Sequence, residues 1–335
     1  MRHEESETSV QPAFAGVDID DGWQTVLAAA ACAEGLERAH EIRTFALADG
    51  TDLRPVPVGH EDAAISWRPE SGWRQELPPS DPRHALIDLY LPICSATTAR
   101  PITVGHLGQS LDGFIATHAG ESQFVTGRAN ILHLHRMRAL SDAIVVGAGT
   151  VAADDPQLTT RHVSGPNPLR VVLDPSRRLG DHYRVFTDDA AETLYVCGRS
   201  LARPGETHFG RARVLPAFDP SGALDVEELL RRLQARGCSR TFIEGGGVTV
   251  SMFLEANVLD RLQVAIAPLI IGNGRPAIRL APPASLGDCQ RPSYRVFRMG
   301  GDVLFDCDLR AEEPGDNEAD SAPGSSAEPP VTRII

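Results

Sequence analysis

Short apolar segments alternate with helix-like segments through the middle of this chain, from residue 98 to residue 310. Six apolar runs bounded by turn residues are strand candidates: 102–107, 143–146, 169–173, 193–197, 241–243 and 262–271. A chain that alternates strands with helices folds as a sheet covered by helices. The sequence therefore predicts an α/β domain over 98–310.

Helix signals fall between the strand candidates. In 128–140, apolar residues recur every three positions, which predicts a helix with one apolar stripe; they are Ile131, Leu134, Met137 and Leu140. A second helix is predicted over 225–236, because Asp225 and Glu228 have capping-box spacing and Gly237 follows where a helix commonly ends.

The two ends of the chain differ from this middle section. Residues 1–97 form an N-terminal extension of unknown role, in which a helix is predicted over 23–39 after Asp20 or Asp21. Residues 311–335 are rich in Pro, Gly, Ser and acidic residues, and their few large apolar residues cannot build a core. We therefore expect a disordered acidic tail.

Charge and hydropathy exclude several classes of partner. The formal net charge of −13 opposes non-specific binding to nucleic acid and to anionic membranes. The chain contains no run of 18 uncharged apolar residues and does not begin with a basic segment before an apolar one. The sequence thus predicts neither a membrane-spanning helix nor a secretory signal, and it indicates a cytoplasmic protein.

Cysteine and histidine spacing does not indicate a metal site. The six cysteines are scattered without a CxxC pair, so we interpret them as buried residues or free thiols rather than a disulfide framework or zinc ligands. His133 and His135 have the spacing of an H-x-H pair, but residues two apart on a helix point in different directions. We expect no bound metal.

Two strand candidates run directly into glycines: FIEGGG at 242–247 and VVGAGTVAADDP at 145–156. Glycines let the phosphates of a ligand approach the backbone, and a helix that follows offers unpaired N–H groups at its positive end. This pattern indicates a dinucleotide site, although it lacks the G-x-G-x-x-G spacing. A tight packing turn would explain the same glycines.

Two arginines flank the second glycine segment, Arg138 before it and Arg161 after it. Two guanidinium groups around a glycine turn can clamp a phosphate, whereas exposed arginines commonly contact only solvent. A third segment, 110–127, combines an Asp112-Gly113 turn with small polar residues that offer hydroxyl donors or merely connect two strands. The residues alone leave both alternatives open for each segment.

Taken together, these segments resemble a known family. GQSLDGFIAT, AGESQFVTG, RALSDAIVVGAGTVAADDPQLTTR, NPLRVVLDP and FIEGGG are similar, in order and spacing, to the reductase domain of the riboflavin-pathway deaminase–reductase family. That domain reduces the ribosyl group of 5-amino-6-(5-phosphoribosylamino)uracil to ribityl with NADPH. The resemblance covers 98–310 and implies a dihydrofolate-reductase-like fold, with a mixed, mostly parallel sheet flanked by helices, in a homodimer.

The resemblance also implies a set of site residues. The implied cofactor contacts are Gly108, Phe124, Thr150, Asp154, Pro175, Ser176, Gly246, Gly247, Val248 and Thr249. The implied substrate contacts are Ser122, Arg138, Leu158, Arg161 and Glu244, with the two arginines on the phosphate and Glu244 on the sugar or its amine. The candidate catalytic residues are Glu244, His106 and Asp112, of which Asp112 shapes the turn between the two sites.

Two departures from the family pattern keep the substrate open. The family usually has lysine where this chain has His106, and commonly tryptophan where it has Phe124. Glu244 and His106 are both candidates for moving the proton, and the sequence does not choose between them. The alternatives are a reductase of a pterin or another heterocycle, and a nucleotide-binding protein without turnover.

Overall fold

The computed structural model describes residues 19–47, 53–123 and 125–310. The chain forms two compact units, Met1–Ser95 and Ala96–Ile335, which we describe separately. The predictions for Phe124 and for the acidic tail fall outside the described residues. None of the helices in the described ranges is long and apolar enough to cross a membrane.

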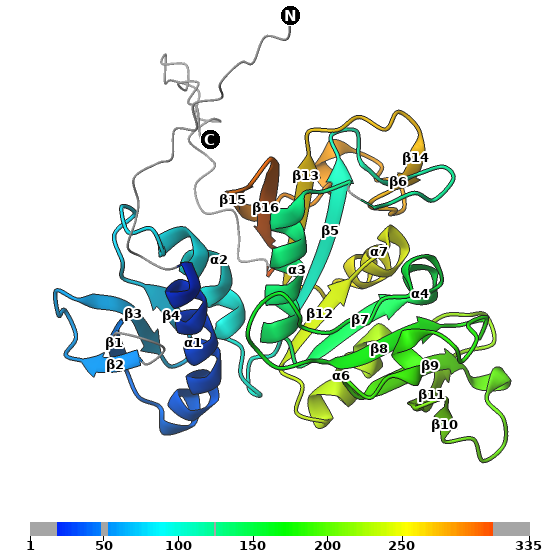
Figure 1. Cartoon of the computed structure of the whole chain (residues 1–335), viewed down its shortest axis with the longest axis horizontal. Coiled ribbons are helices and arrows are strands. Elements are labelled where there is room, and N and C mark those ends of the chain that lie inside the picture. The colour runs from blue at the N-terminus through cyan, green and yellow to red at the C-terminus, as the bar shows by residue number, and fades with distance from the viewer. Residues whose placement is uncertain (1–18, 48–52, 124, 311–335) are drawn as a thin grey trace, which may run out of the picture. The chain divides into compact units, whose positions relative to one another are not determined.

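The first unit is a small antiparallel sheet packed against two helices (Figure 1). Its elements are α1 (Ile19–Ala39), β1 (Arg43–Leu47), β2 (Leu53–Val56), β3 (Ala63–Arg68), β4 (Gly72–Gln75) and α2 (His84–Cys94), with strand order β2-β1-β3-β4. The predicted helix over 23–39 is confirmed, but it begins at Ile19, so Asp20 and Asp21 lie within its first turn rather than before it.

Aromatic side chains form the core of this unit. The rings of Trp67 and Trp73 meet edge to face at 5.2 Å, and those of Trp23 and Tyr90 at 5.6 Å. The indole N–H of Trp73 donates to the carbonyl oxygen of Ala29 at 3.1 Å, which ties β4 to α1. The extension therefore has a buried core of its own.

The second unit is built on a ten-stranded sheet of order β10-β11-β9-β8-β7-β12-β5-β13-β16-β15. Every neighbouring pair from β11 to β13 is parallel, whereas β10, β16 and β15 pair antiparallel. The strands are β5 (Ile102–Ser110), β7 (Ala143–Gly147), β8 (Leu169–Asp174), β9 (Thr193–Gly198), β10 (His208–Phe209), β11 (Ala212–Phe218), β12 (Arg240–Glu244), β13 (Arg261–Ala267), β15 (Ser293–Met299) and β16 (Asp302–Asp308). A separate ribbon pairs β6 (Phe114–Thr117) with β14 (Gly274–Pro276).

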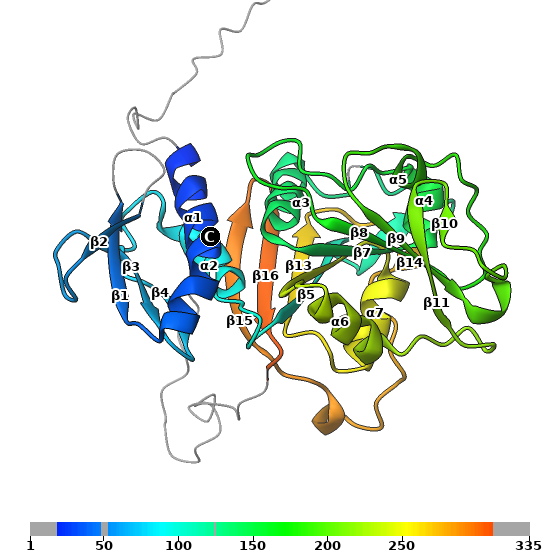
Figure 2. The same ribbon diagram turned by 90° about the horizontal axis from the view of Figure 1, so that it is seen from below.

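Helices cover both faces of this sheet, as Figure 2 shows. They are α3 (Arg128–Leu140), α4 (Ala148–Asp154), α5 (Arg184–Thr187), α6 (Val226–Ala235) and α7 (Gly247–Glu255), with α3 on one face and α6 and α7 on the other. On the α6 and α7 face, leucines and phenylalanine from the helices pack on valine and isoleucine from β7, β8, β9 and β12. The predicted mixed, mostly parallel sheet is thus confirmed.

All six strand candidates are strands of this sheet, and the two predicted helices are present. Asp225 accepts a hydrogen bond from the backbone N–H of Glu228 at 2.8 Å, and Gly237 has φ +89°, as a capped helix that ends at glycine requires. The strand predicted to continue to residue 271 ends at Ala267, because Pro268 cannot donate to the ladder.

The predicted apolar stripe of α3 is only partly buried. Met137 and Leu140 are buried, but Ile131 is 39% exposed, and the buried face also carries His133 and Arg138. The face that α3 turns to the sheet is therefore partly polar, because it covers a polar region of the sheet described below.

Among the glycines of this domain, Gly247, in the turn between β12 and α7, lies closest to the backbone of another segment. A Cβ added at Gly247 would lie 2.0 Å from the carbonyl oxygen of Ala277, directly after β14, whereas one at Gly246 would meet only Thr150 Oγ1, at 3.7 Å. Only glycine fits at 247, while position 246 has room for a methyl group.

We predict that Gly247→Ala destabilises the protein by about 3 kcal/mol or more, because backbone atoms on both sides must shift. Gly246→Ala is the matched control and should cost only about 1 kcal/mol, as a change at a helix N-cap does. Urea unfolding of the two variants measures the difference. Equal stabilities would contradict the close approach.

Candidate functional site

The carboxyl ends of β7 and β12 meet at one edge of the sheet. Both strands run into glycines, and α4 and α7 begin directly after them, with Gly147 and Gly246 at their N-caps and no side-chain cap on either helix. The unpaired N–H groups at the start of α7 suit an anionic group of a ligand. Crevices at the carboxyl ends of parallel strands are where open α/β sheets bind their ligands.

Thr150 holds the two glycine turns together. Its Oγ1 accepts a hydrogen bond from the backbone N–H of Gly246 at 3.3 Å, and Gly245 beside it has φ +120°. Gly147 approaches Thr249 so closely that an added Cβ would lie 2.5 Å from its Oγ1. The structure thus brings together Thr150, Gly246 and Thr249, three of the predicted cofactor contacts.

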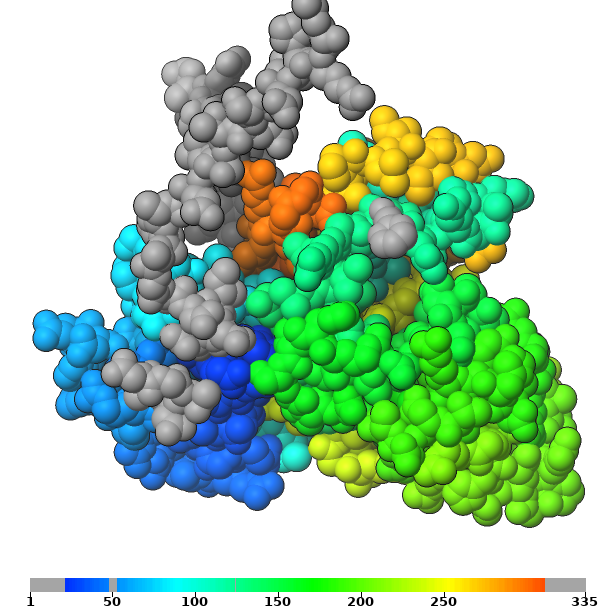
Figure 3. All heavy atoms as spheres, in the orientation of Figure 1, coloured from blue at the N-terminus to red at the C-terminus, as the bar shows by residue number. Residues whose placement is uncertain are grey.

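A cavity of about 300 Å³ opens beside α4. It is lined by Gly120, Glu121, Ser122, Gln123, Ala153 and Asp154. Ser122 and Asp154, which the family resemblance assigned to substrate and cofactor, therefore face the same space. Figure 3 shows this face of the molecule, hollowed between the teal and the green segments. Burial and then the charge of Glu244 raise the pKa of Asp154.

Arg138 and Glu244 form a buried ion pair under this edge. Arg138 Nε donates to Glu244 Oε2 at 2.8 Å, and its Nη2 donates to the other carboxylate oxygen. The side chains are only 8% and 11% exposed. Burial would lower the pKa of Arg138, but the Glu244 carboxylate outweighs it and raises that pKa. The guanidinium group therefore holds Glu244 in one orientation.

Thr159 links this pair to the second arginine. Its carbonyl oxygen accepts from Arg138 Nη1 at 3.3 Å, and its hydroxyl accepts from Arg161 Nη1 at 2.9 Å. Burial, then the charge of Arg138, lowers the pKa of Arg161. The structure brings the two predicted phosphate ligands together, and sequence reasoning missed Thr159, the residue that does so.

The segment carrying Thr159 is fixed on both sides. The backbone N–H of Arg161 donates to His135 Nδ1 at 3.0 Å, and His135 packs edge to face on His162 at 4.4 Å. Leu158 is fully buried with φ +56°, so it shapes the turn that carries Thr159. The sequence treated His135 only as half of an H-x-H pair, and its contact with Arg161 was not foreseen.

His106 lies beside Glu244 in the sheet. The two are register partners on β5 and β12, so their side chains point to the same face, where α3 lies. His106 is buried, and neither of its ring nitrogens has a hydrogen-bond partner among the described residues. Burial, and next the neighbouring His133, keep the pKa of His106 well below its ordinary value. His106 is therefore a neutral imidazole with an N–H donor and an acceptor.

Asp112 has a structural role, unlike the other two catalytic candidates, Glu244 and His106. Its carboxylate accepts from Ser110 Oγ at 2.5 Å and from the backbone N–H groups of Ile271 and Gly272 at 3.1 and 2.6 Å. These bonds lower the pKa of Asp112 to about 2. Asp112 thus fastens the β5–β6 turn to the loop after β13, and no contact between described residues joins it to Glu244.

The remaining predicted contacts surround the same edge. Pro175 and Ser176 form the turn after β8, the strand next to β7, and Val248 is 65% exposed in the first turn of α7. Gly108 lies where a Cβ would be 2.8 Å from Thr126, so its lack of a side chain admits the chain leading into α3. The open space at Gly246, the uncapped α7 and the cavity together fit a nicotinamide dinucleotide.

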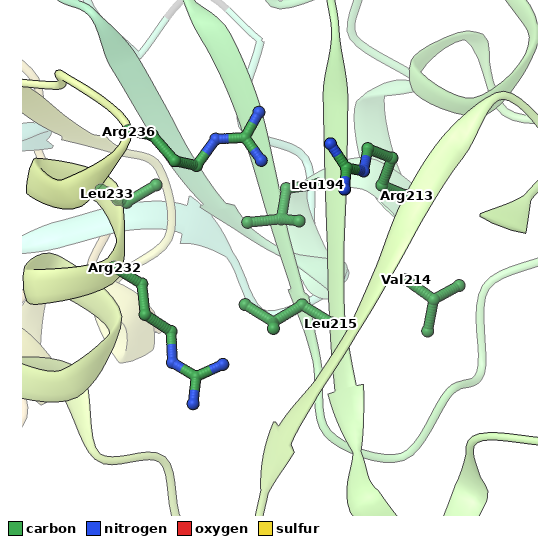
Figure 4. Close-up of a pocket in the computed structure, with 7 residues that line it drawn as sticks. All are labelled: Leu194, Arg213, Val214, Leu215, Arg232, Leu233 and Arg236. Carbon is green, nitrogen blue, oxygen red and sulfur yellow. The ribbon is translucent and has the colours of Figure 1, made fainter. Parts of the chain in front are cut away.

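A second cavity, of about 150 Å³, lies between α6 and the strands β9 and β11 (Figure 4). It is lined by Leu194, Arg213, Val214, Leu215, Arg232, Leu233 and Arg236. Arg236 pairs with Glu192 at 2.7 Å and Arg232 with Glu228 at 2.6 Å. None of the glycine turns or candidate residues lines this cavity, so we do not assign the site to it.

The mostly parallel sheet, the glycine turns at its carboxyl edge and the buried Arg–Glu pair define a reductase of the dihydrofolate-reductase-like class. The chain belongs to the family of the RibD C-terminal domain, which matches residues 102–292. The resemblance predicted from the sequence is thus confirmed, and with it the class of oxidoreductase. Members of this family use a nicotinamide cofactor and a phosphorylated aminopyrimidine.

Relatives support this placement. The chain is 36% identical over 214 residues to the 2,5-diamino-6-ribosylamino-4(3H)-pyrimidinone 5′-phosphate reductase of Methanothermobacter thermautotrophicus, covering 62% of this chain and 97% of the relative. The enzyme of the same name from Archaeoglobus fulgidus is 31% identical over 183 residues, covering 52% and 83%.

A solved structure of the family has the same fold. It is the diaminohydroxyphosphoribosylaminopyrimidine deaminase/5-amino-6-(5-phosphoribosylamino)uracil reductase of Thermotoga maritima, with a TM-score of 0.53 and 26% identity. The match covers 68% of this chain and 60% of that protein, so the chain spans only part of this relative.

We predict that acid weakens the fold through His133 and His135. Burial is the largest cause for both, and it lowers their pKa values to about 4 and about 3, below the ordinary 6.5. The unfolded chain therefore binds protons that the folded chain does not. The contribution of each histidine to the free energy of unfolding is fully present above about pH 6.5. Below that pH it falls by up to about 1.4 kcal/mol per pH unit for each histidine.

Urea unfolding at pH 7.5 and pH 5.0 checks this prediction. His135→Asn retains an acceptor for the Arg161 N–H and should lose one histidine's share of the acid sensitivity. His208→Asn, at an exposed position on β10, is the control and should behave like the wild type. An unchanged pH slope in the first variant would show that His135 titrates normally in the folded protein.

Proposed function

We propose that this protein transfers a hydride from NADPH to C1′ of a 5-amino-6-ribosylaminopyrimidine 5′-phosphate, as 5-amino-6-(5-phosphoribosylamino)uracil reductases do. The observation that carries the proposal is the joint placement of Arg138, Arg161 and Glu244 by Thr159 and by the buried ion pair. The archaeal relatives are named for the 2,5-diamino form of the substrate and the Thermotoga protein for the uracil form. Both forms carry the phosphate that the arginines would bind.

The two arginines would divide the recognition of the phosphate. Arg138 uses three N–H groups on Glu244 and Thr159, so it supplies mainly positive charge and the orientation of Glu244. Arg161 has one side-chain bond, to Thr159, among the described residues. Its other N–H groups are available, and we therefore assign the direct hydrogen bonds to the phosphate to Arg161.

The bound dinucleotide would supply the hydride from C4 of its dihydronicotinamide ring. The protein's residues would align the sugar, exclude water and move a proton. In the substrate, the C1′–O4′ bond breaks as O4′ takes a proton, and the open imine-like form accepts the hydride at C1′. Glu244 and His106 lie on the same face of adjacent strands, and both are candidates for moving this proton. Glu244 is a carboxylate paired with Arg138, so it must first take up a proton before it can give one to O4′. The neutral His106 must gain a proton on one ring nitrogen as it gives the proton from the other.

Support for NADPH rather than NADH comes from the turn after β8. Arg178 follows Pro175 and Ser176, and its Nη2 would lie 3.7 Å from a Cβ placed on Gly149 in the first turn of α4. No ion pair joins Arg178 to an acid among the described residues. A free guanidinium group at this edge is suited to the 2′-phosphate that distinguishes NADPH. The cytoplasmic location and the homodimer belong to the same proposal.

The first test of this function is Arg161→Ala. Losing a charged hydrogen bond of about 2 kcal/mol should lower kcat/KM for the phosphorylated substrate about 30-fold. NADPH oxidation is assayed with both aminopyrimidine forms, with a dephosphorylated analogue and with dihydrofolate. Arg213→Ala, at an exposed arginine on β11, is the control and should match the wild type.

The comparison among substrates shows whether Arg161→Ala weakens recognition of the phosphate alone or lowers activity with every substrate. We expect Arg161→Ala to leave turnover of the dephosphorylated analogue unchanged. Equal kcat/KM of wild type and variant with the phosphorylated substrate would exclude the clamp. Faster turnover of dihydrofolate than of either aminopyrimidine would replace the proposed substrate by a pterin.

The second test is Arg178→Ala. We expect the KM for NADPH to rise tenfold or more while the KM for NADH changes less than twofold, because only NADPH carries the 2′-phosphate. Steady-state kinetics with each cofactor measures the ratio, and Arg184→Ala, at an exposed arginine paired with Asp155, serves as the control. A parallel rise in both KM values would remove Arg178 from cofactor selection.

A further inference from the structure

A row of polar side chains crosses the sheet from its edge to the candidate site. In five adjacent strands, directly opposed residues are Arg295 on β15, Asp306 on β16, Gln263 on β13, His106 on β5 and Glu244 on β12. Register partners place their side chains on the same face of a sheet. The row thus lies under α3, on the face opposite α6 and α7, and it ends at the proposed reaction centre.

Asp306 anchors this row. Its side chain is completely buried, and it accepts hydrogen bonds from Arg261 Nη2 and Arg295 Nη2 at 2.6 Å each. Burial alone would raise the pKa of Asp306, but its hydrogen bonds and the charges of the two arginines outweigh burial and hold that pKa low. Asp306 is therefore a fixed carboxylate that only accepts hydrogen bonds.

The fixed carboxylate sets the orientation of Gln263. Asp306 Oδ1 accepts from Gln263 Nε2 at 3.2 Å, so the amide oxygen of Gln263 must face the other way. That oxygen lies 2.9 Å from His133 Nε2 on α3. Because an amide oxygen only accepts, His133 Nε2 must carry the hydrogen. The network thus selects one neutral tautomer of a fully buried histidine.

His133 in turn contacts His106. The two rings are 5.1 Å apart and tilted by 53°. Near pH 7 the buried His133 is neutral and places no charge beside His106, and its fixed ring limits the positions that the His106 ring can take. The ionisable basic and carboxyl groups on α3, β12, β13 and β16, the elements around His106, are Arg128, His133, His135, Arg136, Arg138, Arg240, Glu244, Arg261, Asp302, Asp306 and Asp308.

We propose that Gln263 is a positioning residue of the reductase site: held by Asp306, it fixes His133 as the Nε2–H tautomer, and His133 fixes the His106 imidazole beside Glu244. The inference rests on the proposed function for its catalytic consequence. The tautomer itself is a property of the folded protein and can be measured without substrate.

The direct test is ¹⁵N NMR of the whole chain labelled at histidine. In the wild type at pH 7 we expect His133 to show a protonated Nε2 and a bare Nδ1, and His106 to be neutral. Gln263→Met removes both amide contacts at similar volume and should give His133 a mixture of tautomers and shift the His106 signals. A wild-type His133 that is an imidazolium or carries the hydrogen on Nδ1 would overturn the proposal, whether or not the variant folds.

The kinetic test asks whether the fixed His133 tautomer and the fixed His106 ring contribute to the rate of the reaction. Gln263→Met should lower kcat about tenfold and leave the KM for NADPH within twofold. Asp308→Asn is the matched control: Asp308 binds Arg261 at 2.8 Å in the same cluster but makes no contact with Gln263, and it should preserve both the tautomer and kcat. An unchanged kcat in folded Gln263→Met, or an equal loss in Asp308→Asn, would refute the positioning role.

The two measurements separate this inference from the proposed function. If the wild type binds NADPH but reduces no aminopyrimidine phosphate, the proposed substrate fails. The NMR result then still decides whether Gln263 sets the tautomer of His133 and the position of His106. A normal rate in the wild type with unaltered His106 signals in Gln263→Met rejects the inference alone.

Discussion

The ion pair between Arg138 and Glu244 is the interaction on which the site depends. It joins the last turn of α3 to the end of β12 and lies almost out of contact with water. Removing one member of such a pair costs about 3–5 kcal/mol, because the other charge stays buried without a partner. The pair therefore fixes the helix against the sheet at the point where the proposed substrate would bind.

The rest of the edge is arranged around that pair by backbone geometry. The glycine turns after β7 and β12 let α4 and α7 begin close together, and Thr150 connects the two turns. Asp112 secures the loop after β13 at the other side. Dinucleotide and sugar would thus meet at a rigid edge, and rigid elements hold a reactive geometry better than free loops do.

Much of this could be predicted from the sequence, because strand and helix periodicities and the Asp225 cap are local signals. The glycine turns were noticed as strand ends that run into glycine, whereas the roles of the two arginines came from the resemblance to the family. The buried face of α3 could not be predicted, because hydrophobic patterning assumes an apolar interface and His133 binds Gln263, which is 130 residues away. Thr159 was missed for a similar reason: its importance comes from two contacts that form only in the folded chain.

The two contacts of Thr159 differ in how they respond to substitution. The bond to Arg138 comes from a backbone carbonyl, which every amino acid has, whereas the bond to Arg161 needs a hydroxyl. Exchange of the side chain would therefore release one arginine and leave the other in place. A lineage could in this way drift toward substrates with a different anionic group while its hydride chemistry stayed intact.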